Sequence, residues 1–270
     1  VALCAFAVGA AVYPSGRSEN ETDWPIAATT DRIVAATDAT WPPMEYVDQS
    51  GNIVGFDIDL FNEVAERAGF SVTYRNTAWD GIFAGIGAGS YDVIVSSVTL
   101  LEERKKQMLF SRPYLVAAQY LVVRSDTEGV SDIQDLQGGE VGAEIGTTGA
   151  RFIRETPGVE VRTYDDLGLG VEDLLNGRLD GIVADTAIVE YFVMRNPRIH
   201  GRLAVVGDAY AVEEYAFPIR KDRPDLKETI DRALDEIMRD GTWWELYKRW
   251  FPAASSEYDS AGEVPAYPGP

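Results

Sequence analysis

Cysteine and histidine are almost absent from this chain. Its 270 residues include one cysteine, Cys4, and one histidine, His200. A lone cysteine excludes a disulfide within the chain, and one cysteine with one histidine cannot supply the four ligands of a structural zinc site. No segment contains Gly-Lys-Ser or Gly-Lys-Thr, so the phosphate-binding loop typical of ATPases is missing as well. We therefore expect no metal and no cofactor, and we interpret His200, in a loop-like stretch, as a surface residue.

Positive charge is also scarce. The chain has 24 Lys and Arg against 44 Asp and Glu, for a net charge of −20 at pH 7. Nucleic acid and anionic membrane surfaces require a basic face, so this composition argues against both as partners. Such acidity fits a protein that works in salty surroundings, where ions screen its self-repulsion. The length and a hydrophobic content of 46% suit two modest globular domains, and we expect a monomer.

Long hydrophobic runs are missing except at the start. Residues 1–13 are apolar, which is too short to span a bilayer but is typical of the core of a secretion signal. Leu3, rather than a small residue, precedes Cys4, so we favour a cleaved signal over a lipid anchor. The sequence thus predicts an extracytoplasmic protein with a signal remnant and polar tether over 1–30. The Ser-, Gly- and Pro-rich residues 253–270 predict a disordered tail.

From residue 32 onward, short apolar strands alternate with amphipathic helices. Two rounds of this alternation predict two α/β domains, each a mostly parallel sheet flanked by helices. One long helix is predicted to begin near Asp57, its expected N-cap, and to stop at Gly69; another should run from Pro224 to Gly241. Further caps are predicted at Asp80, at Asp222 and in two capping boxes, Ser131 with Gln134 and Thr242 with Glu245.

One stretch, residues 93–110, joins an apolar strand to a charged helix through small hydroxyl residues. In parallel α/β sheets, ligands bind at the carboxyl ends of the strands, next to helix N-termini. Ser97 and Thr99 lie at such a strand end, and a charged run that includes Arg104 follows directly. The pattern fits either an ordinary strand-to-helix turn or the polar floor of a site for something small and anionic.

Five segments, in the same order along the chain, resemble the family 3 solute-binding proteins, the polar amino acid receptors of ABC importers. Residues 36–65 look like the family's opening, and residues 79–114 resemble its central signature. The later matches are VGAEIGTTG (141–149), RLDGIVADTAIVEYF (178–192) and DGTWWELYKRWF (240–251). Each motif alone is weak, but together they cover about residues 31–251.

This resemblance implies two lobes joined by paired hinge strands, which close on an amino acid as a clamshell does. A membrane permease would then recognise the closed shape. The first lobe would be discontinuous, formed by residues 31–113 and 214–252, and the second would span 119–209. The chain would cross between the lobes near YLVAA (114–118) and AYAVE (209–213).

The resemblance also implies a clamp for the two charged ends of an amino acid. Arg104 would grip the carboxylate through its planar fork, and Thr148 would donate to the same group from the second lobe. Ser97 and Thr99 would accept from the ammonium, and Asp185 would supply the charged acceptor. On the pattern alone, a solvated helix position is the better interpretation of Arg104, and an N-cap suits Asp185 as well as ligand binding does.

Residues around the expected ligand side chain favour a cationic amino acid. Trp41 and Trp79 match the two aromatic residues that sandwich the side chain in this family, with core packing as the alternative. Asp38 matches an acid that contacts the side chain in family members, and Glu144 stands where relatives often have an amide or a lysine. Two acids beside two indoles favour arginine, lysine or ornithine. Glu45 is less specific and is interpreted as structural.

Three positions depart from the family's pattern: Leu101 where a helix-capping Thr is usual, Gly149 where some relatives have a longer polar residue, and Ala184, which lacks a side chain able to contact a ligand. A receptor for another polar amino acid or a related compatible solute is therefore one alternative. A second is a periplasmic cyclohexadienyl or arogenate dehydratase-like enzyme on the same fold, with Glu144 as its acid. A third, a sensing ectodomain, would need a membrane helix after Phe251. The zwitterion clamp favours the transport receptor over an enzyme.

Overall fold

The structure is a computed structural model that describes residues 32–252 and Ser255. The predicted signal remnant and tether, with Cys4, lie outside the described residues, and so does the predicted tail apart from Ser255. Within the described part of the chain, no helix is long and apolar enough to cross a lipid bilayer.

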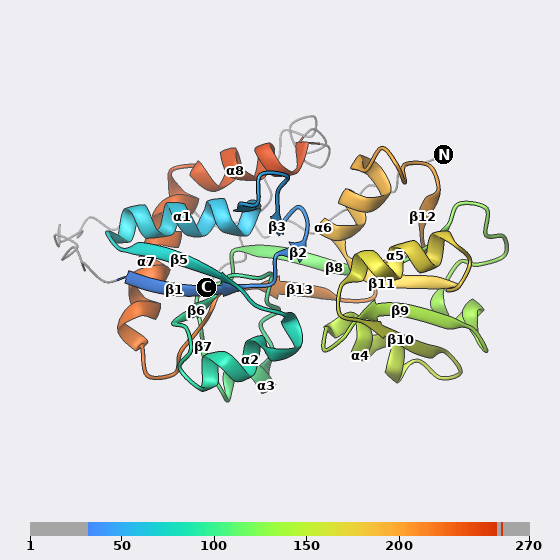
Figure 1. The fold of residues 1–270 in the computed structure, drawn as a ribbon, viewed down its shortest axis with the longest axis horizontal. Helices are drawn as coiled ribbons and strands as arrows, with labels where there is room; N and C mark the ends of the chain where they lie inside the picture. The colour runs from blue at the N-terminus through green and yellow to red at the C-terminus, as the bar shows by residue number, and fades with distance from the viewer. Residues whose placement is uncertain (1–31, 253–254, 256–270) are drawn as a thin grey trace, which may run out of the picture.

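Two separate sheets form the centres of two lobes, which lie side by side in Figure 1. The first sheet has the strand order β5-β1-β6-β14-β7. Its strands are β1 (Arg32–Thr37), β5 (Ser71–Asn76), β6 (Val93–Ile94), β7 (Leu109–Phe110) and β14 (Pro218–Ile219). A small antiparallel sheet beside it contains β2 (Thr40–Trp41), β3 (Glu45–Val47) and β4 (Ile53–Val54).

The second sheet has the order β10-β9-β11-β8-β12, and β13 also pairs with β8. Its strands are β8 (Leu115–Arg124), β9 (Glu140–Glu144), β10 (Glu160–Tyr164), β11 (Gly181–Asp185), β12 (Leu203–Val206) and β13 (Val212–Tyr215). Each sheet has its own hydrophobic cores, and their members include Phe61 and Phe217 in the first lobe and Leu174 and Ile182 in the second.

Helices cover the sheets of both lobes (Figure 1). The first lobe carries α1 (Phe56–Ala68), α2 (Trp79–Gly87), α3 (Glu102–Lys105), α7 (Pro224–Arg239) and α8 (Thr242–Trp250). The second carries α4 (Thr148–Glu155), α5 (Leu167–Leu175), α6 (Thr186–Val189), a 3-10 turn (Ile133–Leu136) and a π-helical turn (Glu190–Arg195). α7 buries the apolar stripe that its sequence predicts, formed by Leu226, Ile230, Ala233, Leu234 and Ile237.

The predicted α/β fold of two lobes is confirmed, but each sheet is mixed in direction. β1 runs parallel to β5 and β6, whereas β14 runs antiparallel to β6 and β7. In the second lobe, β9 is parallel to β10 and β11, and β8 is antiparallel to β11, β12 and β13. The antiparallel strands β8 and β14 are those through which the chain enters the second lobe and returns to the first, so they run against the βα repeats.

β8 and β13 pair side by side where the two lobes meet (Figure 1). Their register joins Ala118 to Val212 and Leu115 to Tyr215, so two lengths of chain cross between the lobes next to each other. The domain limits expected from the sequence, with crossings at 114–118 and 209–213, remain a prediction that this pairing fits.

Several helix caps differ from those predicted, because the turn that starts a helix is set by tertiary contacts. Gly55, not Asp57, precedes α1; its φ is 145°, and a Cβ there would lie 2.0 Å from the Met44 carbonyl oxygen. Only glycine fits such a backbone. The predicted end of α1 at Gly69 and the predicted start of α7 at Pro224 are confirmed. The other caps differ from the predicted ones: Ala78 instead of Asp80 precedes α2, and Arg223 instead of Asp222 precedes α7. The capping box of the 3-10 turn pairs Asp132 with Asp135 instead of Ser131 with Gln134, and Gly241 instead of Thr242 precedes α8.

Candidate functional site

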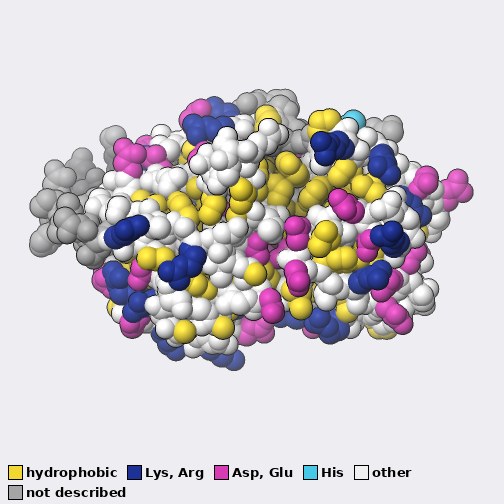
Figure 2. Space-filling model, in the orientation of Figure 1, with side chains coloured by type: hydrophobic (Ala, Val, Ile, Leu, Met, Phe, Trp, Pro, Cys, Tyr) yellow, Lys and Arg dark blue, Asp and Glu magenta, His cyan; other side chains and the backbone are white. Residues whose placement is uncertain are grey.

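A pocket lies between the two lobes, and residues of both lobes line it. Every residue that the sequence predicts as a ligand contact lines it. The first-lobe wall consists of Asp38, Trp41, Glu45, Trp79, Ser96, Ser97, Thr99 and Arg104. The second-lobe wall consists of Glu144, Thr147, Thr148 and Asp185. In Figure 2, acidic side chains gather along the boundary between the lobes.

The pocket lies where the parallel strands of both sheets end. Asp38 directly follows β1, and Ser96 and Ser97 follow β6. Glu144 and Asp185 are the last residues of β9 and β11. Because the carboxyl ends of parallel strands leave a crevice beside helix N-termini, each sheet presents its polar residues to the same space.

A buried acid layer supports the first-lobe wall. Glu45 is 1% exposed; Ser96 Oγ donates to its Oε1 over 3.1 Å and Ser97 Oγ to its Oε2 over 3.2 Å. Asp57 lies beneath and accepts from Ser97 N at 2.7 Å and from Tyr114 Oη at 2.6 Å. Burial raises the pKa of Glu45 well above its usual value and that of Asp57 to about 7, and the Asp57 charge raises the pKa of Glu45 further.

Asp38 belongs to the same layer. Its Oδ2 accepts from Trp79 N at 2.6 Å, its Oδ1 accepts from Thr40 Oγ1 at 2.8 Å, and its own N–H donates to Ser96 Oγ. Burial raises its pKa, and these hydrogen bonds oppose the rise. Ser97 completes the layer with a φ of 48°, which aims its N–H at Asp57. The first-lobe acids are thus largely satisfied by neighbouring donors.

Arg104 is the exception on the first-lobe wall. Its Nη1 donates to the Thr99 carbonyl oxygen at 3.1 Å, and its guanidinium carbon lies 4.5 Å from the centre of the Phe83 ring and 5.7 Å from that of Trp79. It forms no ion pair within 4.0 Å among residues 32–252. Burial lowers its pKa to about 10. A guanidinium has five N–H donors, so most of them remain open to a carboxylate in the pocket.

The second-lobe wall also contains an unsatisfied charged group. Glu144 is 3% exposed, and its Oε2 accepts no hydrogen bond within the described part of the chain. Burial, followed by the nearby charges of Asp38, Asp166 and Asp185, raises the pKa of Glu144 to about 9. The backbone N–H of Leu167 lowers this pKa only in part, so the carboxyl holds its proton at neutral pH until a cation approaches.

Asp185 is held firmly but does not cap a helix. Gln119 Nε2 donates to its Oδ1, Tyr215 Oη donates to its Oδ2, and its side chain makes no capping bond to α6. Burial, and then the charge of Glu213, raises its pKa to about 7. The N-cap alternative for Asp185 is therefore wrong for its side chain, which the hinge strands hold instead.

The hydroxyl groups of the predicted clamp bind protein carboxylates. Thr148 Oγ1 donates to Glu213 Oε2 at 3.0 Å, and Thr99 Oγ1 donates to the same oxygen at 2.8 Å. The Ser97 hydroxyl donates to Glu45. The roles expected for Thr148, Ser97 and Thr99 as direct ligand contacts remain predictions. Thr148 can donate to a ligand carboxylate through its side chain only if its bond to Glu213 rearranges, whereas the Ser97 and Thr99 hydroxyl groups keep lone pairs that can accept from an ammonium.

The two predicted aromatic residues differ in setting. Trp79 begins α2 and is 8% exposed; its ring meets Phe83 edge-on at 4.9 Å between centres, and its Nε1 has no acceptor among the residues described. Trp41 is half-buried and packs against the hydrophobic cores of both lobes. Both rings line the pocket, while their core contacts make them structural as well.

Sequence reasoning missed four residues of this site. Ser96 and Thr147 line the pocket, and Glu45, interpreted as structural, lines it too. Thr147 caps α4 by accepting from Ala150 N at 3.2 Å, so the Thr-Thr pair after the glycine carried the signal. Glu213 gave no signal, because its contacts come from residues more than sixty positions away. The described residues contain no cluster able to hold a metal, and His200 is exposed in a turn, as predicted.

Comparisons with known proteins agree with this geometry. Residues 33–253 match a family model described as bacterial extracellular solute-binding proteins, family 3. The chain is 32% identical over 223 residues to the L-cystine-binding protein TcyJ of Escherichia coli K12, covering 82% of this chain and 83% of that protein. It is 32% identical over 228 residues to the ABC transporter arginine-binding protein 1 of the same organism, covering 84% and 93%. An ancestral arginine-binding protein bound to arginine has a similar structure, with a TM-score of 0.77, 34% identity and coverage of 82% and 98%.

Proposed function

Because the chain belongs to family 3 of the bacterial extracellular solute-binding proteins, we propose that it binds a basic L-amino acid between its lobes and delivers it to the permease of an ABC importer. The candidate ligands are arginine, lysine and ornithine. The contacts would be those predicted from the sequence: Asp38, Trp41, Trp79, Ser97, Thr99, Arg104, Glu144, Thr148 and Asp185.

The observation that carries this proposal is the open cation of Arg104 across the pocket from Asp185. A free amino acid has a carboxylate and an ammonium, and burying either one unpaired costs several kcal/mol. Arg104 offers spare N–H donors to the carboxylate from the first lobe. Asp185 offers a fixed carboxylate to the ammonium from the second lobe. A ligand with both charges is neutralised only when both lobes contact it, which couples binding to closure.

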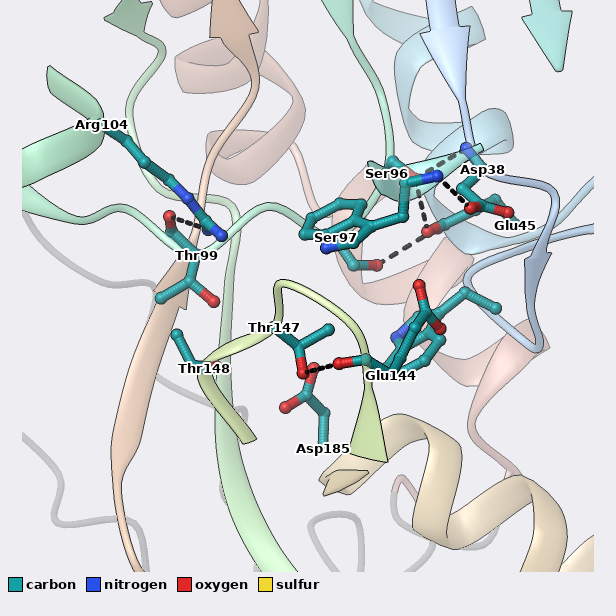
Figure 3. A pocket seen from close by; sticks show the side chains of 12 residues that line it. Asp38, Glu45, Ser96, Ser97, Thr99, Arg104, Glu144, Thr147, Thr148 and Asp185 are labelled. Carbon is teal, nitrogen blue, oxygen red and sulfur yellow. Dashed lines mark hydrogen bonds between the residues drawn. The ribbon is translucent and has the colours of Figure 1, made fainter. Parts of the chain in front are cut away.

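The acidic residues support a cationic side chain. In Figure 3, Arg104 lies on one side of the pocket, and Asp38, Glu45 and Glu144 lie on the other. An amino acid with its carboxylate at Arg104 would extend its side chain toward these acids. The Oε2 atom of Glu144, which has no donor among the residues described, would gain a partner from a guanidinium or ammonium group. The rings of Trp41 and Trp79 would cover the aliphatic stem.

The same end of the pocket disfavours cystine, the ligand named for one relative. The far end of cystine carries a second carboxylate as well as a second ammonium. That carboxylate would meet Asp38 and Glu144 with no basic residue other than Arg104 in the pocket lining. Asp38 would repel that carboxylate, whereas a guanidinium would be attracted to Asp38 and would favour ionisation of Glu144, so arginine suits this charge pattern better.

Delivery would follow from the two-lobed architecture. The family is extracellular by description, and the hinge pair β8 and β13 lets each lobe move as a unit while both contact the ligand. The predicted secretion signal fits export from the cytoplasm. In this proposal the monomer works outside the cytoplasmic membrane, where a permease recognises its closed form.

Titration calorimetry with purified protein tests the ligand class directly. L-Arginine, L-lysine and L-ornithine should bind with micromolar or tighter affinity, and each should raise the melting temperature by mass action. L-Cystine, L-glutamine and L-histidine are the comparison ligands. Tighter binding of cystine or of a neutral amino acid would refute the basic preference, and no binding by any amino acid would refute the receptor assignment.

One observation favours an enzyme as a second candidate. Burial raises the pKa of Glu144 to about 9, so the pocket contains a carboxylic acid that is protonated at neutral pH and could donate a proton to a leaving group. A cyclohexadienyl dehydratase-like activity would use it in this way. Incubation with prephenate or arogenate tests this candidate: product formation that the substitution Glu144→Gln abolishes would support it, and no turnover would exclude it.

A further inference from the structure

Glu213 is an acid at the hinge that contacts both lobes. It lies in β13, is half-buried and pairs across the strand with Ala117 of β8. Its Oε2 accepts from Thr99 Oγ1 of the first lobe at 2.8 Å and from Thr148 Oγ1 of the second at 3.0 Å. Gln119 Nε2 lies at 3.5 Å from the same oxygen. Glu213 therefore joins two hydroxyl groups of the pocket wall.

These bonds use up the donors that a ligand carboxylate would need from the two threonines. A threonine hydroxyl has one hydrogen to donate. Thr148 gives that hydrogen to Glu213 and accepts from Gln119 Nε2 at 3.1 Å, so its side chain has no donor left. Thr99 likewise donates to Glu213. The Glu213 carboxylate thus accepts the hydrogen bond from Thr148 that was expected to go to a ligand carboxylate.

The charge of Glu213 acts on both ends of the predicted clamp. After burial, it is the leading influence on the pKa of Arg104, which it raises, and on that of Asp185, which it also raises. A fixed anion at this place attracts a ligand ammonium and repels a ligand carboxylate. Arg104 keeps Glu213 as a nearby opposite charge whether or not a ligand carries a carboxylate.

We propose that Glu213 serves as an internal carboxylate of the site, and that the pocket therefore also accepts the decarboxylated counterpart of a basic amino acid, a guanidino-amine or a diamine. Agmatine, which is arginine without its carboxylate, is the simplest such ligand. Its amine pairs with Asp185, and its guanidinium extends toward Asp38 and Glu144. This inference rests on the proposed function in one respect, because it uses the same pocket and the same acidic end.

The experiment compares two ligands on three proteins by titration calorimetry. L-Arginine and agmatine are titrated into the wild type, Glu213→Gln and Glu214→Gln. Glu214 is the matched control: it is the next residue of β13, it is exposed, and its substitution removes the same charge. In the wild type, agmatine should bind within about tenfold of arginine. Glu213→Gln should shift the affinity ratio toward arginine by at least about tenfold, and Glu214→Gln should leave it unchanged.

Each outcome decides a different point. If arginine binds the wild type but agmatine does not at about a thousand times its concentration, the inference is overturned and the proposed function stands. If agmatine binds and arginine does not, the inference is supported and the amino acid ligand is wrong. If neither binds, both fail. If the affinity ratio shifts equally in both variants, or does not shift in Glu213→Gln, then Glu213 does not act as the internal carboxylate. Glu213→Asp, which keeps the charge, should keep agmatine binding and guards against a folding defect.

Discussion

The buried acids on the two walls of the pocket differ in the number of hydrogen bonds they accept. On the first-lobe wall, Glu45 receives two hydroxyl donors, and Asp57 beneath it receives a backbone N–H and a tyrosine hydroxyl. On the second-lobe wall, Glu144 is equally buried, yet no donor reaches its Oε2 among residues 32–252. Burial raises the pKa of all three. Asp57 also has one oxygen, Oδ1, without a donor among the residues described, but two strong donors reach its other oxygen. Glu144 has only the backbone N–H of Leu167 to offset the cost of its burial.

This difference separates acids that build the pocket from an acid that awaits a partner. A buried carboxyl with internal donors holds neighbouring segments together, as Glu45 does for the loop after β6. A buried carboxyl with an oxygen that has no donor, as Glu144 has at Oε2, destabilises the protein unless a ligand supplies one. Arg104 on the first-lobe wall resembles Glu144 on the second-lobe wall in one respect: part of its hydrogen-bonding capacity is unused. The pocket thus has one open cation and one open acid, on opposite lobes.

Removing the open cation should have the largest effect. Arg104→Ala should weaken the binding of L-arginine by about 2–5 kcal/mol, the usual cost of stranding the charged partner of a buried pair. Titration calorimetry measures the loss. Lys105→Ala is the matched control, because Lys105 is the next residue and pairs with Glu102 on the surface. Equal affinities for Arg104→Ala and the wild type would mean that Arg104 does not bind the ligand.

Replacing the open acid should stabilise the free protein. The pKa of Glu144 rises from 4.5 to about 9 on folding, so between these values the folded state holds a proton that the unfolded chain releases. Stability contributed by this carboxyl is therefore lost as the pH rises through that window. Glu144→Gln cannot ionise and should exceed the wild type by about 2–4 kcal/mol at pH 8, with little difference at pH 4.

Urea unfolding at both pH values measures this gain in the free energy of unfolding. Glu160→Gln serves as the control, since Glu160 is exposed on the adjacent strand β10. A Glu144→Gln variant that is less stable than the wild type at pH 8 would show that the hydrogen bonding of Glu144 outweighs the cost of burying its charge.

The satisfied acids of the first lobe should respond in the opposite direction. Tyr114→Phe removes the hydroxyl that donates to Asp57 at 2.6 Å but keeps the ring stacked on Phe217 at 4.3 Å between centres. We expect a loss of about 1–2 kcal/mol in the free energy of unfolding, because a buried acceptor loses a donor. Tyr164→Phe, whose hydroxyl donates to the half-buried Asp173, should cost less than about 0.5 kcal/mol. Equal losses would contradict the comparison.

Proton release on binding should change the affinity by about 0.6–1.4 kcal/mol for each pH unit. A ligand guanidinium beside Glu144 lowers the raised pKa of that carboxyl, so the complex gives up a proton that the free protein holds at pH 7. Affinity for arginine should then rise about threefold to tenfold per pH unit between pH 6 and 8. Calorimetry in phosphate and in Tris, which differ in ionisation enthalpy, counts the protons. In Glu144→Gln the count should fall toward zero; a count already near zero in the wild type would contradict the prediction.

Much of this site could be predicted from the sequence because it follows local rules. Strand ends in βα units face one crevice, so Ser97 and Thr99 could be assigned to it from the pattern alone. Glu144 and Asp185 could be assigned to it through the family resemblance. The family motifs then singled out Arg104 from an ordinary charged helix. The fold class followed from the alternation of strands and helices in the same way.

What the sequence could not predict depends on contacts between distant residues. Asp57 looked like a helix cap, but its carboxylate instead serves Ser97, forty residues away. Glu213 received no attention, although it joins threonines from both lobes. The mixed direction of the sheets comes from β8 in the second lobe and β14 in the first, which run antiparallel to their neighbours, and the alternation pattern does not encode this direction. In each case the deciding partner lies far along the chain.

The packing of Trp41 has a consequence for spectroscopy. Its indole touches the hydrophobic cores of both lobes and also borders the pocket. Any separation of the lobes must uncover one face of this ring to water, and any occupant of the pocket must change what the other face meets. If the lobes open and close as the proposed function requires, this indole is a built-in fluorophore whose emission wavelength should follow that movement without a chemical label.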